Sequence, residues 1–262
     1  VHQKDSSRLY IAKYTSYITD DLTVSALVGK QNLEHLQQPF GYDPNCPYIS
    51  SSATVQAPGL TYNACQQGAV TSLLIPGAND KTHGWRLDVE YRLGDHTLRA
   101  GYDAQTAESL TGSAYPGGYA WVYGKQTDPN IGIDASHGVA SPASAGGLGA
   151  QGYFDSRAYH TQNAKVKTEQ QAQFIEDRWQ ITDRWLLSLG LRNEQFSNYN
   201  GDGKPYARQR HQLAPRIGAA WDVFGDSSLK LFANAGRYHL AMPNNVAVRG
   251  ASGSLITNEY YT

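Results

Sequence analysis

The 262-residue sequence has little of what marks the commoner protein classes. No apolar run approaches the roughly 18 residues that a transmembrane helix needs, so it contains no helical membrane anchor. Lys and Arg number 22 against 23 Asp and Glu, so it lacks the basic excess that binds nucleic acid. It has one Met, none at residue 1, and no apolar leader. We therefore expect an internal part of a longer chain.

Motifs for catalysis and for cofactors are also missing. Neither H-E-x-x-H nor G-x-S-x-G occurs, and the eight His are scattered. The stretch from Gly147 to Gly152 matches G-x-G-x-x-G, but a dinucleotide site needs a strand before it and a helix after it. Ser- and Pro-rich sequence precedes it instead. The sequence predicts a flexible loop here, and no enzyme, no cofactor and no metal site.

Cysteine is nearly absent. The two cysteines, Cys46 and Cys65, lie in a polar stretch that contains Pro and Ser. Two cysteines in such a loop predict a disulfide and an oxidising compartment such as the periplasm or cell surface. The alternative is two unrelated surface thiols.

Tyrosine, tryptophan and glycine are abundant, and apolar residues alternate with polar ones. The chain has 18 Tyr, 5 Trp and 26 Gly. Between 85 and 93 the odd-numbered residues are Trp, Leu, Val, Tyr and Leu, while the even-numbered ones are charged. Similar runs cover 185–194 and 216–223. Period-2 alternation predicts strands with one apolar and one polar face. The mean hydropathy of −0.52 agrees with a membrane barrel, which exposes only alternate residues to lipid.

Short turns alternate with long loops along the chain. Short turns rich in Asp, Gly and Thr occupy 18–22, 93–98, 181–185 and 224–229. Long connections are predicted near 36–81, 108–164, 198–209 and 239–262. An up-and-down sheet then carries all tight turns at one end, as outer-membrane barrels do. We predict an all-β fold, an antiparallel up-and-down transmembrane β-barrel with about eight strands in this chain. The alternative is a soluble β-sandwich.

Three stretches resemble the barrels of TonB-dependent receptors. Residues 173–192 carry an aromatic residue, an acidic residue and a Trp, then a turn and Leu-x-Leu-Gly-Leu-Arg. Residues 213–218 and 231–238 carry similar Pro-Arg-x-Gly and Gly-Arg-Tyr strands. The likeness is closest to the Oar-like branch of the family. Outside about 170–238 it is only architectural.

The resemblance implies an outer-membrane receptor for TonB-coupled uptake of a scarce solute such as a siderophore, carbohydrate or peptide. The partners would be outer-membrane lipid, a small or medium solute, and the TonB complex through regions that this sequence lacks. The family's TonB box, plug and terminal strand are not seen, so residues 1–262 are expected to form part of one barrel domain of roughly 22 strands. Alternatives are an outer-membrane barrel enzyme and a structural or adhesive barrel.

Two sets of candidate functional residues follow from this interpretation. Charged residues on the polar strand face are expected to line the lumen and pair across strands: Arg86, Asp88, Glu90, Arg92, Arg192, Glu194 and Arg216, with Arg99, Asp103 and Asp222 beside them. Aromatic residues of the longest predicted loop are expected to contact solute, because they offer stacking area at low entropic cost: Tyr115, Tyr119, Trp121, Tyr123 and Tyr153. The alternative for the second set is loop packing.

Overall fold

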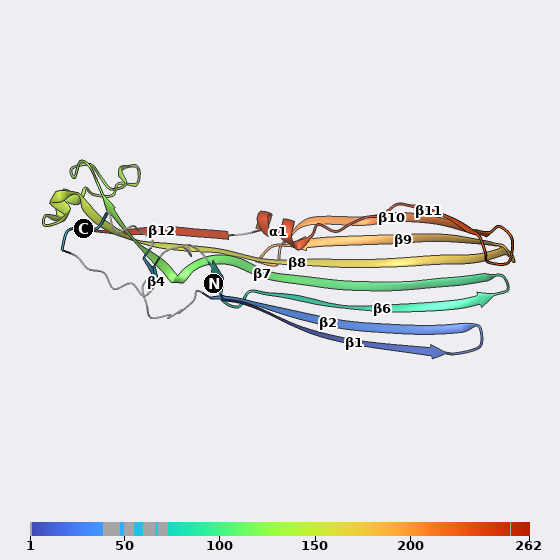
Figure 1. Ribbon diagram of the computed structural model, residues 1–262. Coiled ribbons are helices and arrows are strands. Elements are labelled where there is room, and N and C mark those ends of the chain that lie inside the picture. The colour runs from blue at the N-terminus through green and yellow to red at the C-terminus, as the bar shows by residue number, and fades with distance from the viewer. Residues whose placement is uncertain (1, 39–47, 50–54, 60–65, 68–72, 252) are drawn as a thin grey trace.

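The computed structural model describes residues 2–38, 48–49, 55–59, 66–67, 73–251 and 253–262. It confirms the all-β, antiparallel, up-and-down architecture (Figure 1). One sheet runs in the order β1-β2-β6-β7-β8-β9-β10-β11, and each neighbouring pair is antiparallel. The predicted Cys46–Cys65 disulfide lies outside the described residues and stays a prediction.

The strands of this path are long. They are β1 (His2–Tyr17), β2 (Leu22–Gln38), β6 (Asn79–Leu93), β7 (His96–Lys125), β8 (Tyr153–Thr182), β9 (Trp185–Tyr199), β10 (Pro205–Asp222) and β11 (Lys230–Gly236). Off the path lie β3 (Tyr48–Ile49), β4 (Gln66–Gln67), β5 (Leu73–Leu74), α1 (Asn244–Ala251) and β12 (Gly253–Tyr261). None of the described helices is long and apolar enough to cross a membrane.

The four predicted short turns are all present, and they lie at one end of the sheet (Figure 1). Local side-chain oxygens hold them together. Thr19 Oγ1 accepts the backbone N–H of Leu22 at 3.0 Å, and Asp222 accepts those of Gly225 and Ser227 at 2.8 and 2.9 Å. Asp222 therefore caps a turn at the end of β10, on the same side of that strand as Arg216.

Three predicted loops are wrong in extent. Most of 108–164 is strand, because β7 and β8 extend to 30 residues each and leave only 126–152 between them. The connection predicted at 198–209 is a tight turn between β9 and β10. The segment 239–262 contains α1 and β12. The added strands follow from backbone pairing, which needs no apolar stripe, so hydrophobic patterning missed them.

An irregularity in β7 divides its two halves. The pairing with β8 passes from Ala114↔Thr161 to Tyr119↔Tyr159, so β7 uses five steps where β8 uses two. Gly117 and Gly118 adopt φ of 75° and 90° there, values that favour glycine. The odd shift reverses which side chains of β7 point to each face of the sheet.

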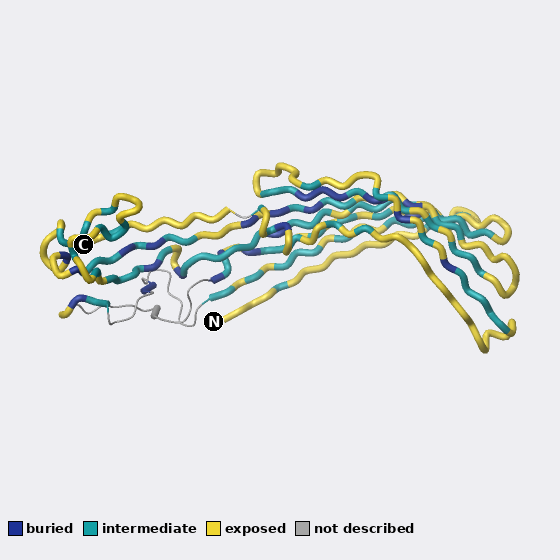
Figure 2. The backbone as a smooth tube through the Cα atoms, turned by 90° about the horizontal axis from the view of Figure 1, so that it is seen from above, coloured by how far each residue is buried: buried dark blue, intermediate teal, exposed yellow. Residues whose placement is uncertain are grey.

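The sheet has covered and uncovered parts. Buried backbone follows the inner strands, whereas the N-terminal strand is exposed along most of its length (Figure 2). β9 pairs with β8 only from residue 167 onward, and β12 pairs with the preceding part of β8, residues 155–163. This β7–β8–β12 extension reaches beyond the other long strands (Figure 1), and the short strands β3 and β5 pair with its β7.

Candidate functional site

The alternating residues fall on two chemically different faces of the sheet. In register, Trp85, Leu87 and Val89 of β6 share a face with Leu189 of β9 and Ile217 of β10. These apolar side chains are 38–51% exposed. We call this the apolar face, and the opposite one the polar face. So much exposed aliphatic surface on one side is abnormal for a monomeric soluble protein.

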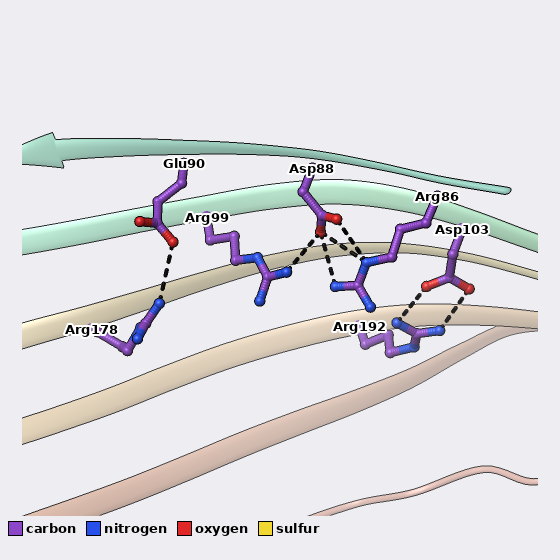
Figure 3. Close-up of polar contacts among 7 residues, drawn as sticks. All are labelled: Arg86, Asp88, Glu90, Arg99, Asp103, Arg178 and Arg192. Carbon is purple, nitrogen blue, oxygen red and sulfur yellow. Dashed lines mark hydrogen bonds and ion pairs between the residues drawn. The ribbon is translucent and has the colours of Figure 1, made fainter. Parts of the chain in front are cut away.

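The polar face carries a network of ion pairs on β6 and β7 (Figure 3). Asp88 accepts from Arg86 at 2.9 Å and from Arg99 at 3.1 Å. Both guanidinium groups also lie over the buried ring of Phe174, 4.8 and 5.8 Å from its centroid. Gly101 makes room for that ring, since a Cβ there would lie 2.5 Å from it.

A second set of ion pairs spans three strands. Arg192 of β9 donates to Asp103 of β7 at 2.9 Å, and to Glu194 on its own strand at 2.7 Å. Ala172 of β8 lies in register between Asp103 and Glu194, and its small side chain leaves room for this contact. Arg178 reaches Glu90 at 3.3 Å (Figure 3). Six predicted residues, Arg86, Asp88, Glu90, Arg192, Glu194 and Arg216, thus share the polar face with Asp103 and Arg99.

Arg92 lies apart from this network. It stands at the short-turn end of β6, where its backbone N–H donates to the carbonyl of Asp21 at 2.9 Å.

A segment after β11 folds over the polar face. We define residues 238–251, which include α1, as the strap. Asn198 Nδ2 donates to the carbonyl of Met242 at 3.1 Å, and the Thr168 hydroxyl donates to Asn244 Oδ1 at 2.5 Å. The guanidinium of Arg216 lies 4.6 Å from the centroid of the Tyr238 ring. These contacts hold the strap against β8, β9 and β10.

An open cavity of about 540 Å³ lies between the strap and the sheet. Its lining includes Glu194, Phe196, Arg216, Tyr238 and Met242. Glu194 Oε2 and Arg216 Nε are buried and have no hydrogen-bond partner among the described residues. The cavity is therefore lined by a carboxylate, a guanidinium group and aromatic rings, while one polar atom of each of the two charged groups is buried beside it.

All five aromatic residues that were expected in a loop lie in strands β7 and β8. Tyr119 and Trp121 gather with Tyr159 of β8 and Tyr261 of β12, with ring centroids 5.6–6.3 Å apart. Arg157 lies at their centre, 5.2–5.9 Å from each ring centroid, and pairs with Glu259 of β12. We call these six residues the Arg157 cluster.

The other expected aromatic residues lie beside or away from this cluster. Tyr123 follows on the same side of β7, and Tyr153 accepts a hydrogen bond from Lys125 Nζ at 3.1 Å. Tyr115 packs instead on Tyr48 and His160, at 6.0 and 5.7 Å.

Sequence reasoning missed four of the six residues of the Arg157 cluster. Arg157 and Tyr159 alternate in a strand that was predicted to be loop, and Glu259 and Tyr261 alternate in another. That spacing was the available signal. Arg157 and Glu259 are 102 residues apart in the sequence, so only the fold reveals that they meet.

The sheet has long up-and-down strands, short turns at one end only, and one apolar and one polar face. These features define an outer-membrane β-barrel. Residues 13–255 match the family model described as TonB dependent receptor-like, beta-barrel. The chain belongs to this family, which confirms the resemblance seen in the sequence.

The chain is also similar to individual proteins. The chain is 33% identical over 161 residues to the TonB-dependent transporter Oar of Myxococcus xanthus, covering 62% of this chain and 15% of that protein. It thus spans about 15% of the length of that relative. Among solved structures, the alcaligin outer-membrane receptor FauA from Bordetella pertussis is 12% identical, with 88% of this chain and 35% of that chain covered and a TM-score of 0.28. FpvAI, solved in complex with pyocin S2, is 9% identical, with 88% and 36% covered and a TM-score of 0.31.

Proposed function

We propose that the chain forms part of the wall of an outer-membrane receptor that takes up a scarce solute, powered through TonB, and that it acts by transport and not by catalysis. Family membership supports this proposal. The partners are outer-membrane lipid on the apolar face, solute on the polar face, and the TonB complex.

The separation of the two faces is the observation that carries the proposal. Leu189 and Ile217 expose 42% and 51% of their surface on one face, which is favourable against lipid and unfavourable against water. The opposite face holds Asp88, Arg192 and Glu194 in ion pairs. Charged residues at this depth are tolerated in a barrel where they face the lumen.

The solute is proposed to pass along the polar face and meet the strap. The cavity beneath the strap is lined by Glu194, Arg216 and the ring of Tyr238, and Glu194 Oε2 and Arg216 Nε are buried without a hydrogen-bond partner among the described residues. A buried donor and acceptor without partners cost free energy until a ligand or water satisfies them. Of the five aromatic residues expected to contact solute, only Tyr115 packs its ring on His160. His160 is next to Tyr159 in β8 and therefore points to the opposite face, which is the polar one.

Spin labelling of the full-length receptor in lipid vesicles tests the face assignment. Labels replacing Leu189 and Ile217 should be accessible to oxygen, which dissolves in hydrocarbon. Labels replacing Ser188 and Gly218, the adjacent residues on the other face, should be accessible to a water-soluble nickel chelate. Equal accessibility at all four positions would contradict a lipid-facing wall.

Uptake in cells tests the transport role. The full-length gene, expressed in a Gram-negative host with and without a working TonB, should support accumulation of one labelled ferric siderophore, oligosaccharide or peptide only when TonB works. Accumulation that does not depend on TonB would contradict energy-coupled transport. Arg216→Gln should weaken uptake more than Arg92→Gln, its control at the far end of the same face.

A further inference from the structure

The Arg157 cluster lies on the face of β8 that is continuous with the apolar face. Residues 157 and 159 have the same parity as Ile175 and Trp179, and β8 is one uninterrupted strand between them. Successive residues of a strand point to opposite faces. The even-numbered residues Ser156 and Ala158 are 7% exposed, so it is the odd-numbered side that remains open.

The cluster also lies beyond the hydrocarbon. Arg157 is 18 residues from Ile175 (175 − 157), which is ~60 Å of extended strand. The apolar band of an outer-membrane barrel is only ~25 Å tall. The cluster is at the long-strand end, opposite the four short turns (Figure 1). Resting on the face assignment proposed above, it therefore points outward, away from the lumen and above the membrane.

The chemistry of the cluster suits a sugar chain. Tyr119, Trp121 and Tyr261 present ring faces that can stack on the C–H surface of a pyranose, and their polar edges can bond hydroxyl groups. Arg157 supplies donors. Hydrogen bonds from Arg157 and Tyr261 lower the pKa of Glu259, so this side chain remains an ionised acceptor.

The balance of charge argues against a phosphate-rich ligand. Arg157 is already paired with Glu259, and Lys125 lies 4.5 Å from the ring centroid of Tyr153 and bonds its hydroxyl. Recognition of phosphate uses unpaired cations with bidentate geometry. A largely neutral saccharide is the better match.

We propose that the Arg157 cluster binds the saccharide chain of a neighbouring lipopolysaccharide, outside the barrel. In the outer leaflet, lipopolysaccharide sugars occupy the space directly above the hydrocarbon and beside the barrel wall. The cluster meets them with stacking rings and a neutralised ion pair. Solute recognition is left to the polar face.

The test measures lipopolysaccharide retained by the purified full-length receptor. The receptor is exchanged into detergent, then incubated with smooth lipopolysaccharide, with deep-rough lipopolysaccharide that ends near lipid A, or with the detached polysaccharide. Binding is followed by native mass spectrometry. The wild type should bind the smooth form and the detached polysaccharide at least about tenfold more tightly than the double variant Tyr119→Ala/Trp121→Ala. Deep-rough binding should be unchanged by the substitutions.

Two further variants keep the outcome interpretable. Tyr10→Ala/Tyr14→Ala removes two exposed tyrosines from β1, 64% and 68% exposed, and should not affect smooth lipopolysaccharide. Arg157→Gln leaves the rings in place and should weaken binding of the detached polysaccharide. Each variant should keep the heat-resistant electrophoretic mobility of a folded barrel.

Two results would overturn the proposal. One is equal retention of smooth and deep-rough forms by wild type and by the cluster variant. The other is lost solute uptake in the cluster variant with unchanged polysaccharide binding, which would make the rings solute contacts. Neither result depends on the spin-label test, so a failure here is distinguishable from a failure of the proposed transport function.

Discussion

Placing an arginine at Leu189 is the sharpest perturbation of the apolar face. Leu189 is four residues from Trp185 at the short turn (189 − 185) and pairs with Ile217 and Asp177 across the sheet. Four residues rise ~13 Å along a strand, or ~10 Å along the membrane normal at a tilt of ~40°. With Trp185 at the interfacial aromatic girdle, position 189 is close to the middle of a ~25 Å apolar band.

The expected cost of Leu189→Arg is therefore that of a midplane arginine on the lipid face. That cost is ~2–4 kcal/mol, which lowers the folding equilibrium constant by about 1.5 to 3 orders of magnitude. The assay is reversible folding of the full-length barrel into phospholipid vesicles, followed in denaturant. The matched control is Ser188→Arg, one residue away on the polar face.

The control variant Ser188→Arg should lower the free energy of unfolding much less than Leu189→Arg does. Ser188 pairs with Arg178, and like charges directly opposite each other destabilise by up to about 1 kcal/mol. The difference between the two variants reports the face assignment without relying on either absolute value. Equal free-energy costs for the two variants, or a larger cost at Ser188, would refute the reasoning. The apolar side chains would then have to be buried in a protein core and not face lipid.

Three other predictions address the rest of the sheet. Asp103→Asn and Arg192→Gln, combined in a double-mutant cycle of barrel stability, should show a coupling of about 0.5–1 kcal/mol, because both side chains are about a quarter exposed; additive costs would show that the ion pair contributes nothing. His35 lies 13 residues along β2 from Leu22 (35 − 22), past the ~9–11 residues that cross a membrane. Its ring nitrogens donate hydrogen bonds to the carboxylates of Asp5 and Asp80 when the ring is protonated, and these bonds raise its pKa. The stabilisation of the barrel by protonated His35 should be complete below the unfolded pKa of about 6.5 and lost as pH rises through the raised folded pKa. His35→Gln should therefore make the denaturation midpoint fall less as pH rises. An unchanged dependence of the midpoint on pH would assign the fall to other groups. Gly101→Ala should cost ~1–3 kcal/mol of barrel stability because its Cβ would lie 2.5 Å from the underlying ring, while Gly190→Ala, with no atom nearer than 3.5 Å, should cost less; equal costs would mean that the ring moves aside freely.

The fold was predictable wherever burial or lipid imposed an alternation. The strands around Trp85 and Leu189 and all four short turns were found from side-chain type alone. The polar face was also predictable as a set, because its charges share parity. Their partners were not: Arg192 meets Asp103 across two strand intervals, a relation fixed by register and by the small side chain between them.

The strand extensions could not be found in the same way. Above the membrane neither face of the sheet is pressed against hydrocarbon, so selection for an apolar stripe ends while backbone pairing continues. β7 and β8 accordingly continue through Gly-, Ser- and Tyr-rich sequence that looks like a loop. The strap has the same difficulty, since α1 is only eight residues long, too short for its helical pattern to stand out in the sequence.

The side on which the aromatic residues lie depends on one irregularity in β7. Before Ala114 the odd-numbered residues of β7, such as Asp103, point to the polar face, and after Tyr119 they point to the opposite one. Pro116 has no backbone N–H to give the ladder, and two glycines with positive φ absorb the extra residues. Simple counting along β7 would put Tyr119 and Trp121 in the lumen, as solute contacts. The observed register places them on the side of the apolar face, and this reversal separates the proposed solute site from the proposed saccharide surface.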